Sequence, residues 1–254
     1  MIAEKRKALL IDKLRKDGYV QATDFASDVK ISAATIRRDL IQLEKEGYCI
    51  RKRGGAVRST QSVTMELPYE IKKNRNTAEK RRIANRALDL IENGDTILMD
   101  AGSTIYSLAC LLHTKEQLTV ITNDLNIAVK LAANPKINLI CTGGIARPNV
   151  YTLQGVQVVE FINDLRVDKS FIGADAIHKD GIISNVNIDE VPIKQAMIKA
   201  ADTVALLTDS SKFSLTGFAR VASICEMDFV VTDENMPEKY FKYCKDNNVQ
   251  LIVA

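Results

Sequence analysis

The sequence predicts an α/β protein with a small N-terminal winged helix-turn-helix domain and a larger C-terminal domain built on a mainly parallel sheet. Residues 1–58 show helical periodicity that ends in a basic hairpin, whereas the chain after residue 95 alternates short apolar strands with helices. Charge divides in the same place. Residues 1–58 carry 14 Lys and Arg against 8 Asp and Glu, and residues 59–254 carry 21 against 24. A basic head on a mildly acidic body is typical of a nucleic-acid-binding module joined to a second domain.

Three helices are predicted in the head, at residues 4–17, 21–29 and 33–46. Gly18 and Gly47 end the first and the third, because glycine adopts the left-handed conformation that commonly closes a helix. In the third helix Ile36, Leu40 and Leu43 fall at i, i+4 and i+7, which predicts one buried stripe. Two short extended segments around Gly54-Gly55 then predict a hairpin over residues 48–58.

The third helix has the features of an element that enters the DNA major groove end-first. Ser32 is a good N-cap, small residues follow it, and two arginines stand just behind. Basic residues on the hairpin are suited to phosphates. The candidate DNA contacts are Ser32, Ala33, Ala34, Thr35, Arg37, Arg38 and Gln42 on the helix and Arg51, Lys52, Arg53 and Arg58 on the hairpin. The alternative is an amphipathic helix with a solvated basic face.

Residues 59–76 are polar and weakly patterned, which predicts a linker before the body at 77–254. The body is predicted to open with a helix at 77–91. Strands are predicted at 96–99, 119–122, 137–141, 169–172, 204–207, 229–231 and 250–253. Helices are predicted between them at 104–112, 125–133, 156–161, 192–201 and 237–247.

Polar or glycine clusters follow most of these strands, and the carboxyl ends of strands in an open α/β sheet are where ligands bind. Gly102-Ser103-Thr104 opens a helix directly after a strand, which favours phosphate. Lys212 is expected to hold the same phosphate, with Asp100, Asn123 and Asp175 on sugar hydroxyls. The candidate ligand-binding residues are Asp100, Gly102, Ser103, Thr104, Asn123, Gly143, Gly144, Arg147, Asp175, Glu190, Lys194 and Lys212. Each loop taken alone also fits a tight turn or a solvated surface.

Several site classes lack their sequence signature. The chain has no GxGxxG after a strand, no GxxxxGK[ST] and no GxSxG, which disfavours dinucleotide, nucleoside triphosphate and serine hydrolase sites. Two distant histidines and no CxxC predict no metal site and no cofactor. The five scattered cysteines are expected to be reduced core thiols. With no signal peptide and no apolar run of membrane-spanning length, they predict a cytoplasmic protein that does not contact a membrane.

Motifs across nearly the whole chain resemble the DeoR family of bacterial transcriptional repressors. The matching stretches include Thr35-Ile36-Arg37-Arg38-Asp39-Leu40, Arg51-x-x-Gly54-Gly55-Ala56, Asp100-x-Gly102-Ser103-Thr104, Gly143-Gly144-x-x-Arg147, Gly173-Ala174 and Asp209-Ser210-Ser211-Lys212. The resemblance implies a sensor domain with the fold of ribose-5-phosphate isomerases and CoA transferases. It also implies a phosphorylated sugar or sugar alcohol as inducer, and a homodimer or homotetramer on double-stranded operator DNA. Ile105 departs from the family, which often has a second threonine there.

A sugar-phosphate isomerase with an added DNA-binding module is the alternative function. Gly173-Ala174-Asp175 and Ser211-Lys212 are similar to isomerase active-site motifs. The isomerase motif carries another aspartate three positions before the one that matches Asp175, and Ile172 stands there instead. Because isomerisation needs a positioned general base, the missing carboxylate favours a regulator without catalytic residues.

Overall fold

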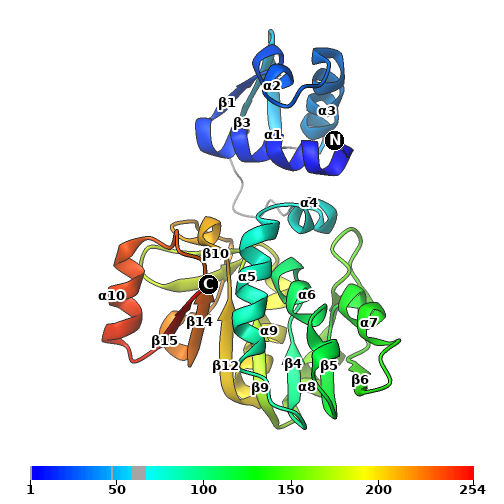
Figure 1. Ribbon diagram of the computed structural model, residues 1–254, viewed down its shortest axis with the longest axis vertical. Coiled ribbons are helices and arrows are strands. Elements are labelled where there is room, and N and C mark those ends of the chain that lie inside the picture. The colour runs from blue at the N-terminus through cyan, green and yellow to red at the C-terminus, as the bar shows by residue number, and fades with distance from the viewer. Residues whose placement is uncertain (1, 47, 59–66) are drawn as a thin grey trace. The chain divides into compact units, whose positions relative to one another are not determined.

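A computed structural model describes residues 2–46, 48–58 and 67–254 (Figure 1). Gly47, the predicted end of the third helix, and residues 59–66 of the predicted linker lie outside the described residues, as does the side chain of Arg58. The chain divides into two compact units, Met1–Arg75 and Asn76–Ala254, and each is described by itself.

The first unit has the winged helix-turn-helix arrangement that the sequence predicts. Its elements are α1 (Ala3–Asp17), β1 (Tyr19–Gln21), α2 (Ala22–Asp28), α3 (Ala33–Lys45), β2 (Cys49–Lys52), β3 (Gly55–Arg58) and α4 (Tyr69–Lys73). Gly18 ends α1 at φ +74° and donates its N–H to Leu14, as expected. The short strand β1 was not predicted; it pairs with β3 at the edge of the β2–β3 hairpin.

The predicted linker contains ordered structure that belongs to the first unit. Helix α4 packs against α1, and Leu67 and Ile71 join the core of the head. Arg75 forms an ion pair with Asp12 of α1. The first unit therefore continues to Arg75 instead of ending at residue 58. The two apolar residues four apart in this polar segment were the available signal.

The second unit contains all seven predicted parallel strands. Its strands are β4 (Thr96–Met99), β5 (Leu118–Thr122), β6 (Ile137–Cys141), β7 (Ile145–Ala146), β8 (Leu153–Gln154), β9 (Val167–Ile172), β10 (Ala176–Ile177), β11 (Ile182–Asn185), β12 (Ala201–Leu207), β13 (Ala219–Ser223), β14 (Phe229–Thr232) and β15 (Gln250–Val253). Its helices are α5 (Thr77–Leu88), α6 (Ser103–Ala109), α7 (Leu125–Leu131), α8 (Val156–Asn163), α9 (Val191–Ala200) and α10 (Glu238–Asp246). Short 3₁₀ turns lie at Leu112–Thr114, Ile188–Glu190, Ser210–Lys212 and Ile224–Glu226.

The large sheet has the order β15-β14-β12-β9-β4-β5-β6, and each neighbouring pair is parallel. The chain moves outward from β4 through β5 to β6 and then returns to β9 on the other side of β4. The order therefore reverses between β4 and β9, and the carboxyl ends of these two strands mark the point where an open α/β sheet binds its ligand.

Alternate residues of the strands pack into two cores. Ile97 and Met99 face a core shared with α5, α6 and α7, which Figure 1 shows in front of the strands. Leu98 and Ile172 face the other core, with α8, α9, α10 and the small antiparallel sheet β10-β11-β13. That sheet and the β7–β8 hairpin were not predicted, because their strands are short and carry no long apolar run. No helix in the described part of the chain has the length and apolar content to cross a bilayer.

The five cysteines are free. Cys49 and Cys244 are buried, as expected for core thiols, but Cys110 is only partly buried and Cys141 and Cys225 are exposed. The expectation of five core thiols is therefore wrong for these three residues.

Candidate functional site

Helix α3 presents the predicted DNA-reading face to solvent. Ser32 caps it, accepting the N–H of Thr35 at 3.2 Å, as predicted. Ile36, Leu40 and Leu43 are buried. Ser32, Ala34, Arg37, Arg38 and Gln42 are exposed, and Ala33 and Thr35 are partly exposed. Neither Arg37 nor Arg38 has a hydrogen bond or an ion pair to another described residue, so both guanidinium groups are available to a ligand.

The neighbouring Asp39 has a different environment. It is buried and accepts two hydrogen bonds from the Arg6 guanidinium of α1, one of them from Nη2 at 3.1 Å. The hydrogen bond that Arg6 donates to Asp39 raises the pKa of Arg6. This bidentate pair fixes α3 on α1 and thereby orients the arginines that precede Asp39.

The hairpin contributes fewer free cations than its sequence indicates. Arg51 donates its backbone N–H and its Nε to Glu44 at 2.8 and 2.6 Å, and these hydrogen bonds lower the pKa of Glu44. Gln42 donates to Glu46 at 2.7 Å. Lys52 and Arg53 are exposed. A phosphate that binds Arg51 therefore competes with Glu44.

In the second unit, Asp100 and Lys194 form a buried ion pair at the point where strand order reverses. Asp100 follows β4 and also accepts the N–H of Gly173, which follows β9, at 2.8 Å. Lys194 donates a further hydrogen bond to the Gly173 carbonyl at 3.1 Å. Burial lowers the pKa of Lys194, but the negative charges of Asp100 and Glu190 outweigh it, so the pKa is raised.

Glu190 accepts hydrogen bonds from three polar side chains that lie in other segments of the chain. Its carboxylate accepts from Arg147 at 3.1 Å, Thr152 at 3.0 Å and Asn185 at 2.8 Å. The structure therefore joins the predicted Arg147 and Glu190. Thr152 and Asn185 were not predicted, because they lie in or beside the antiparallel strands that the sequence did not reveal.

Asp124 joins the loops after β4 and β5 and was also missed. Its carboxylate caps α7 through the N–H groups of Asn126 and Ile127, and it accepts the Gly102 N–H at 3.2 Å. Burial raises the pKa of Asp124 to about 6. An aspartate directly before a predicted helix was the available signal.

Asn123 has an uncompensated polar atom. It is buried, and its Nδ2 donates to the Leu153 carbonyl at 3.3 Å, but its Oδ1 has no hydrogen-bond partner among the described residues. A buried acceptor without a donor is costly and is expected to receive one from a ligand or water.

The loop after β12 holds Lys212 beside a buried carboxylate. Asp209 accepts the N–H and hydroxyl of Ser211 and the Asn76 amide, the latter at 2.8 Å. Although burial raises the pKa of Asp209, the charges of Lys212 and Lys80 and these hydrogen bonds lower it overall.

The remaining predicted residues have mixed surroundings. Asp175 accepts the Val186 N–H at 3.2 Å. Thr104 is partly buried and Ser103 buried in the first turn of α6. Gly143 and Gly144 are exposed at positive φ, and a Cβ on Gly144 would lie 2.6 Å from Val158, so this glycine is required by the turn itself. Ile105 is buried in the core, so a threonine there would not place its hydroxyl in solvent.

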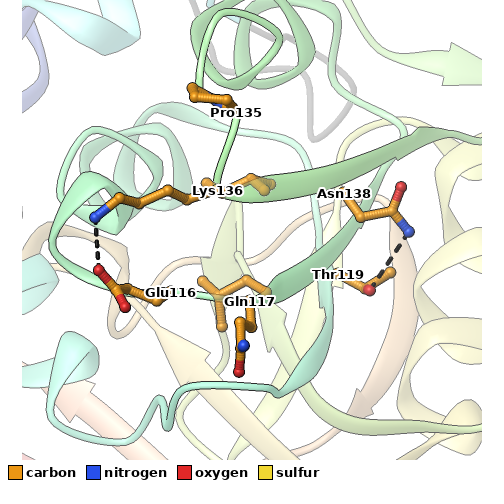
Figure 2. Close-up of a pocket in the computed structure, with 8 residues that line it drawn as sticks. Glu116, Gln117, Thr119, Pro135, Lys136 and Asn138 are labelled. Carbon is orange, nitrogen blue, oxygen red and sulfur yellow. Dashed lines mark hydrogen bonds and ion pairs between the residues drawn. The ribbon is translucent and has the colours of Figure 1, made fainter.

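A pocket of about 560 Å³ lies at the other end of the sheet, beside the amino ends of β5 and β6 (Figure 2). It is lined by residues 116–119 and 135–138, and Glu116 and Lys136 pair across it at 2.6 Å. Both side chains are more than half exposed, so the pocket lacks the buried polar groups found at the carboxyl ends of the strands. Within the described ranges, no group of three or more His, Cys, Asp and Glu side chains could hold a metal ion.

Comparisons with known proteins match both units. Residues 75–234 match the DeoR C-terminal sensor domain, and residues 6–62 match the DeoR-like helix-turn-helix domain. The glycerol-3-phosphate regulon repressor of Escherichia coli K12 is 31% identical over 95% of each chain. The transcriptional repressor GlcR of Bacillus subtilis is 30% identical over 100% of this chain and 97% of its own. Ribose-5-phosphate isomerase A of Methanocaldococcus jannaschii aligns with a TM-score of 0.40 and 17% identity, over 54% of this chain and 55% of that one.

Proposed function

This chain belongs to the DeoR family of DNA-binding transcriptional regulators, and from that premise we propose that it represses a carbohydrate-utilisation operon until a phosphorylated sugar or sugar alcohol binds its second unit. The family and the curated relatives are regulators, so the isomerase alternative is not kept. Since operator DNA is its target, we place it in the cytoplasm.

The DNA half of the proposal is supported by α3. Its capped tip and two exposed arginines fit a helix whose first turns meet base edges in the major groove. The cations of the hairpin, Lys52 and Arg53 among them, then contact the DNA phosphates. In a homodimer or homotetramer, two such helices would reach successive major grooves.

The ligand half is supported most by the polar side chains on the loops after β4, β5, β9 and β12, among which Asp100, Asn123 and Asp209 are buried. These strands are neighbours at the centre of the sheet, so their loops lie side by side. The first-turn N–H groups of α6 have no intrahelical acceptors, and Lys212 adds a cation. Together they favour a phosphate. Asn123 Oδ1 is then an acceptor for a sugar hydroxyl. One relative is named for the glycerol-3-phosphate regulon, which is consistent with a phosphorylated polyol.

The sequence predicts that Asp100 hydrogen-bonds a sugar hydroxyl, but in the structure Asp100 already has partners of its own. Because its carboxylate already binds Lys194 and the Gly173 N–H, a ligand at this point must either leave the pair intact or exchange with it. The ligand controls DNA binding only through its difference in affinity between the DNA-competent and DNA-incompetent states.

A thermal-shift screen of the full chain tests the ligand half. The panel pairs phosphorylated sugars and sugar alcohols with their unphosphorylated counterparts. Stabilisation by phosphorylated compounds alone is expected, since only a ligand of the folded state raises the melting temperature. Lys212→Ala should abolish that shift, while the operator sequence that the protein selects stays the same. Equal shifts from both members of each pair, or a normal response in the variant, would remove the phosphate site from the loop after β12.

A further inference from the structure

Two consecutive residues are anchored in different units. The side chain of Arg75, the last residue of the first unit, pairs with Asp12 of α1. The side chain of Asn76, the first residue of the second unit, donates to Asp209 at 2.8 Å and to Ser211 at 3.1 Å. The residue held by the first unit and the residue held by the second are therefore consecutive in the chain.

Asn76 does not perform the task usual for its position. An asparagine at a helix N-cap normally accepts an N–H from the first turn of its own helix. Asn76 precedes α5 but makes no such bond, and its backbone lies in the left-handed region at φ +48° and ψ +42°. Its Nδ2 is instead directed to the loop after β12. The side chain is therefore held by the loop after β12 and not by the first turn of its own helix.

The loop that receives this amide is sensitive to charge. Asp209 is almost wholly buried and is balanced by the positive charges of Lys212 and Lys80. A phosphate that engages Lys212 would withdraw positive charge from Asp209 and so change how strongly this carboxylate binds its hydrogen-bond donors. The Nδ2 of Asn76 is one of those donors.

We infer that Asn76 transmits the state of the 209–212 loop to the connection with the DNA-binding unit. The two anchored residues are consecutive, so their Cα atoms lie only about 3.8 Å apart. Release of Asn76 from Asp209 and Ser211 therefore frees the residue bonded to Arg75. This inference rests on the proposed function, since the loop is taken to be the ligand site.

Residue-resolved hydrogen exchange on the full chain, without ligand or DNA, tests the coupling in both directions. Ser211→Ala should speed exchange of the Arg75 and Lys80 amides, which bond to Lys72 and Asn76 carbonyls, by about two- to tenfold. Asn76→Gly, which keeps the left-handed backbone accessible, should speed exchange of the Ser211 and Lys212 amides by a similar factor. In the Asn76→Gly background, Ser211→Ala should add nothing at Arg75.

Asn248→Gly is the matched control. Asn248 also has a positive φ, of 58°, and lies between α10 and β15, away from the loop. The Asn248→Gly variant should exchange the four amides named above, those of Arg75, Lys80, Ser211 and Lys212, at wild-type rates. Unchanged exchange in either direction, an equal Ser211→Ala effect in both backgrounds, or faster exchange throughout the second unit would overturn the coupling. Because no sugar phosphate or operator is present, failure of the proposed function cannot produce these results.

Discussion

The two units hold their charged candidate residues in opposite ways. In the first unit Arg37 and Arg38 are exposed on one short helix and have no partner among the described residues. In the second unit Asp100, Lys194 and Glu190 are buried and already compensated. These two candidate DNA contacts are therefore exposed and without partners in the described part of the fold, whereas the candidate ligand-binding charges are also part of the fold. Substitutions should therefore separate affinity from stability in the first unit but not in the second.

Lys194→Ala is expected to have the largest effect. It leaves Asp100 buried without its cation, and removing one partner of a buried ion pair costs about 3–5 kcal/mol of unfolding free energy. Calorimetry of the full chain should show a lower melting temperature for the second unit. Lys199→Ala, at an exposed position on the same helix, is the matched control and should melt like wild type. Equal melting of both variants would mean that the pair is not structural.

Asp124→Asn is expected to change the pH dependence of stability. The folded-state pKa of Asp124 is about 6, above its usual 3.8. The contribution of its neutral form to the free energy of unfolding is therefore complete below about pH 4 and is lost as pH rises through about 6. The stability of wild type relative to Asp124→Asn should fall by up to about 3 kcal/mol across that window. Urea unfolding at a series of pH values measures this. Asp246→Asn, at an exposed position, should show no such change, and a flat difference for Asp124→Asn would contradict the burial argument.

Arg37→Ala and Arg38→Ala should weaken operator binding without affecting stability. A residue that reads a base is worth about 1–3 kcal/mol, with relaxed specificity at the base it contacts. Melting temperatures should stay near wild type, because exposed substitutions change stability by about 0.5 kcal/mol or less. Fluorescence anisotropy with labelled operator DNA measures the affinity. Lys45→Ala, exposed at the other end of α3, is the control. Should both arginine variants bind normally, α3 is not the reading element.

Ser32→Ala is expected to have the smallest effect. Removing the hydroxyl that accepts the Thr35 N–H should cost about 1 kcal/mol of helix stability. The first turn of α3 should then show faster hydrogen exchange, while the core of the first unit is unchanged. An unaltered first turn would show that the cap is not needed to order the tip.

The sequence predicted the features that depend on local signals, but it did not predict the contacts between residues far apart in the chain. Helix α3, its cap and the hairpin were predicted because their signals are local, and the seven parallel strands were predicted because each is a continuous apolar run. The pairing of Asp100 with Lys194 joins residues 94 positions apart, which spacing alone cannot reveal. The same is true of Glu190 with Arg147 and of Asn76 with Asp209. Residue types and their places after the strands indicate candidate ligand-binding residues, but they do not indicate which of these residues neutralise one another.

Selection of DNA from a random pool by the full chain tests the central claim most directly. Wild type and Lys212→Ala should enrich the same sequence motif, with half-sites spaced for two recognition helices. Arg37→Ala with Arg38→Ala should fail to enrich it. Enrichment of one motif by all three proteins, or of none by wild type, would contradict a division between a DNA-reading first unit and a ligand-sensing second unit.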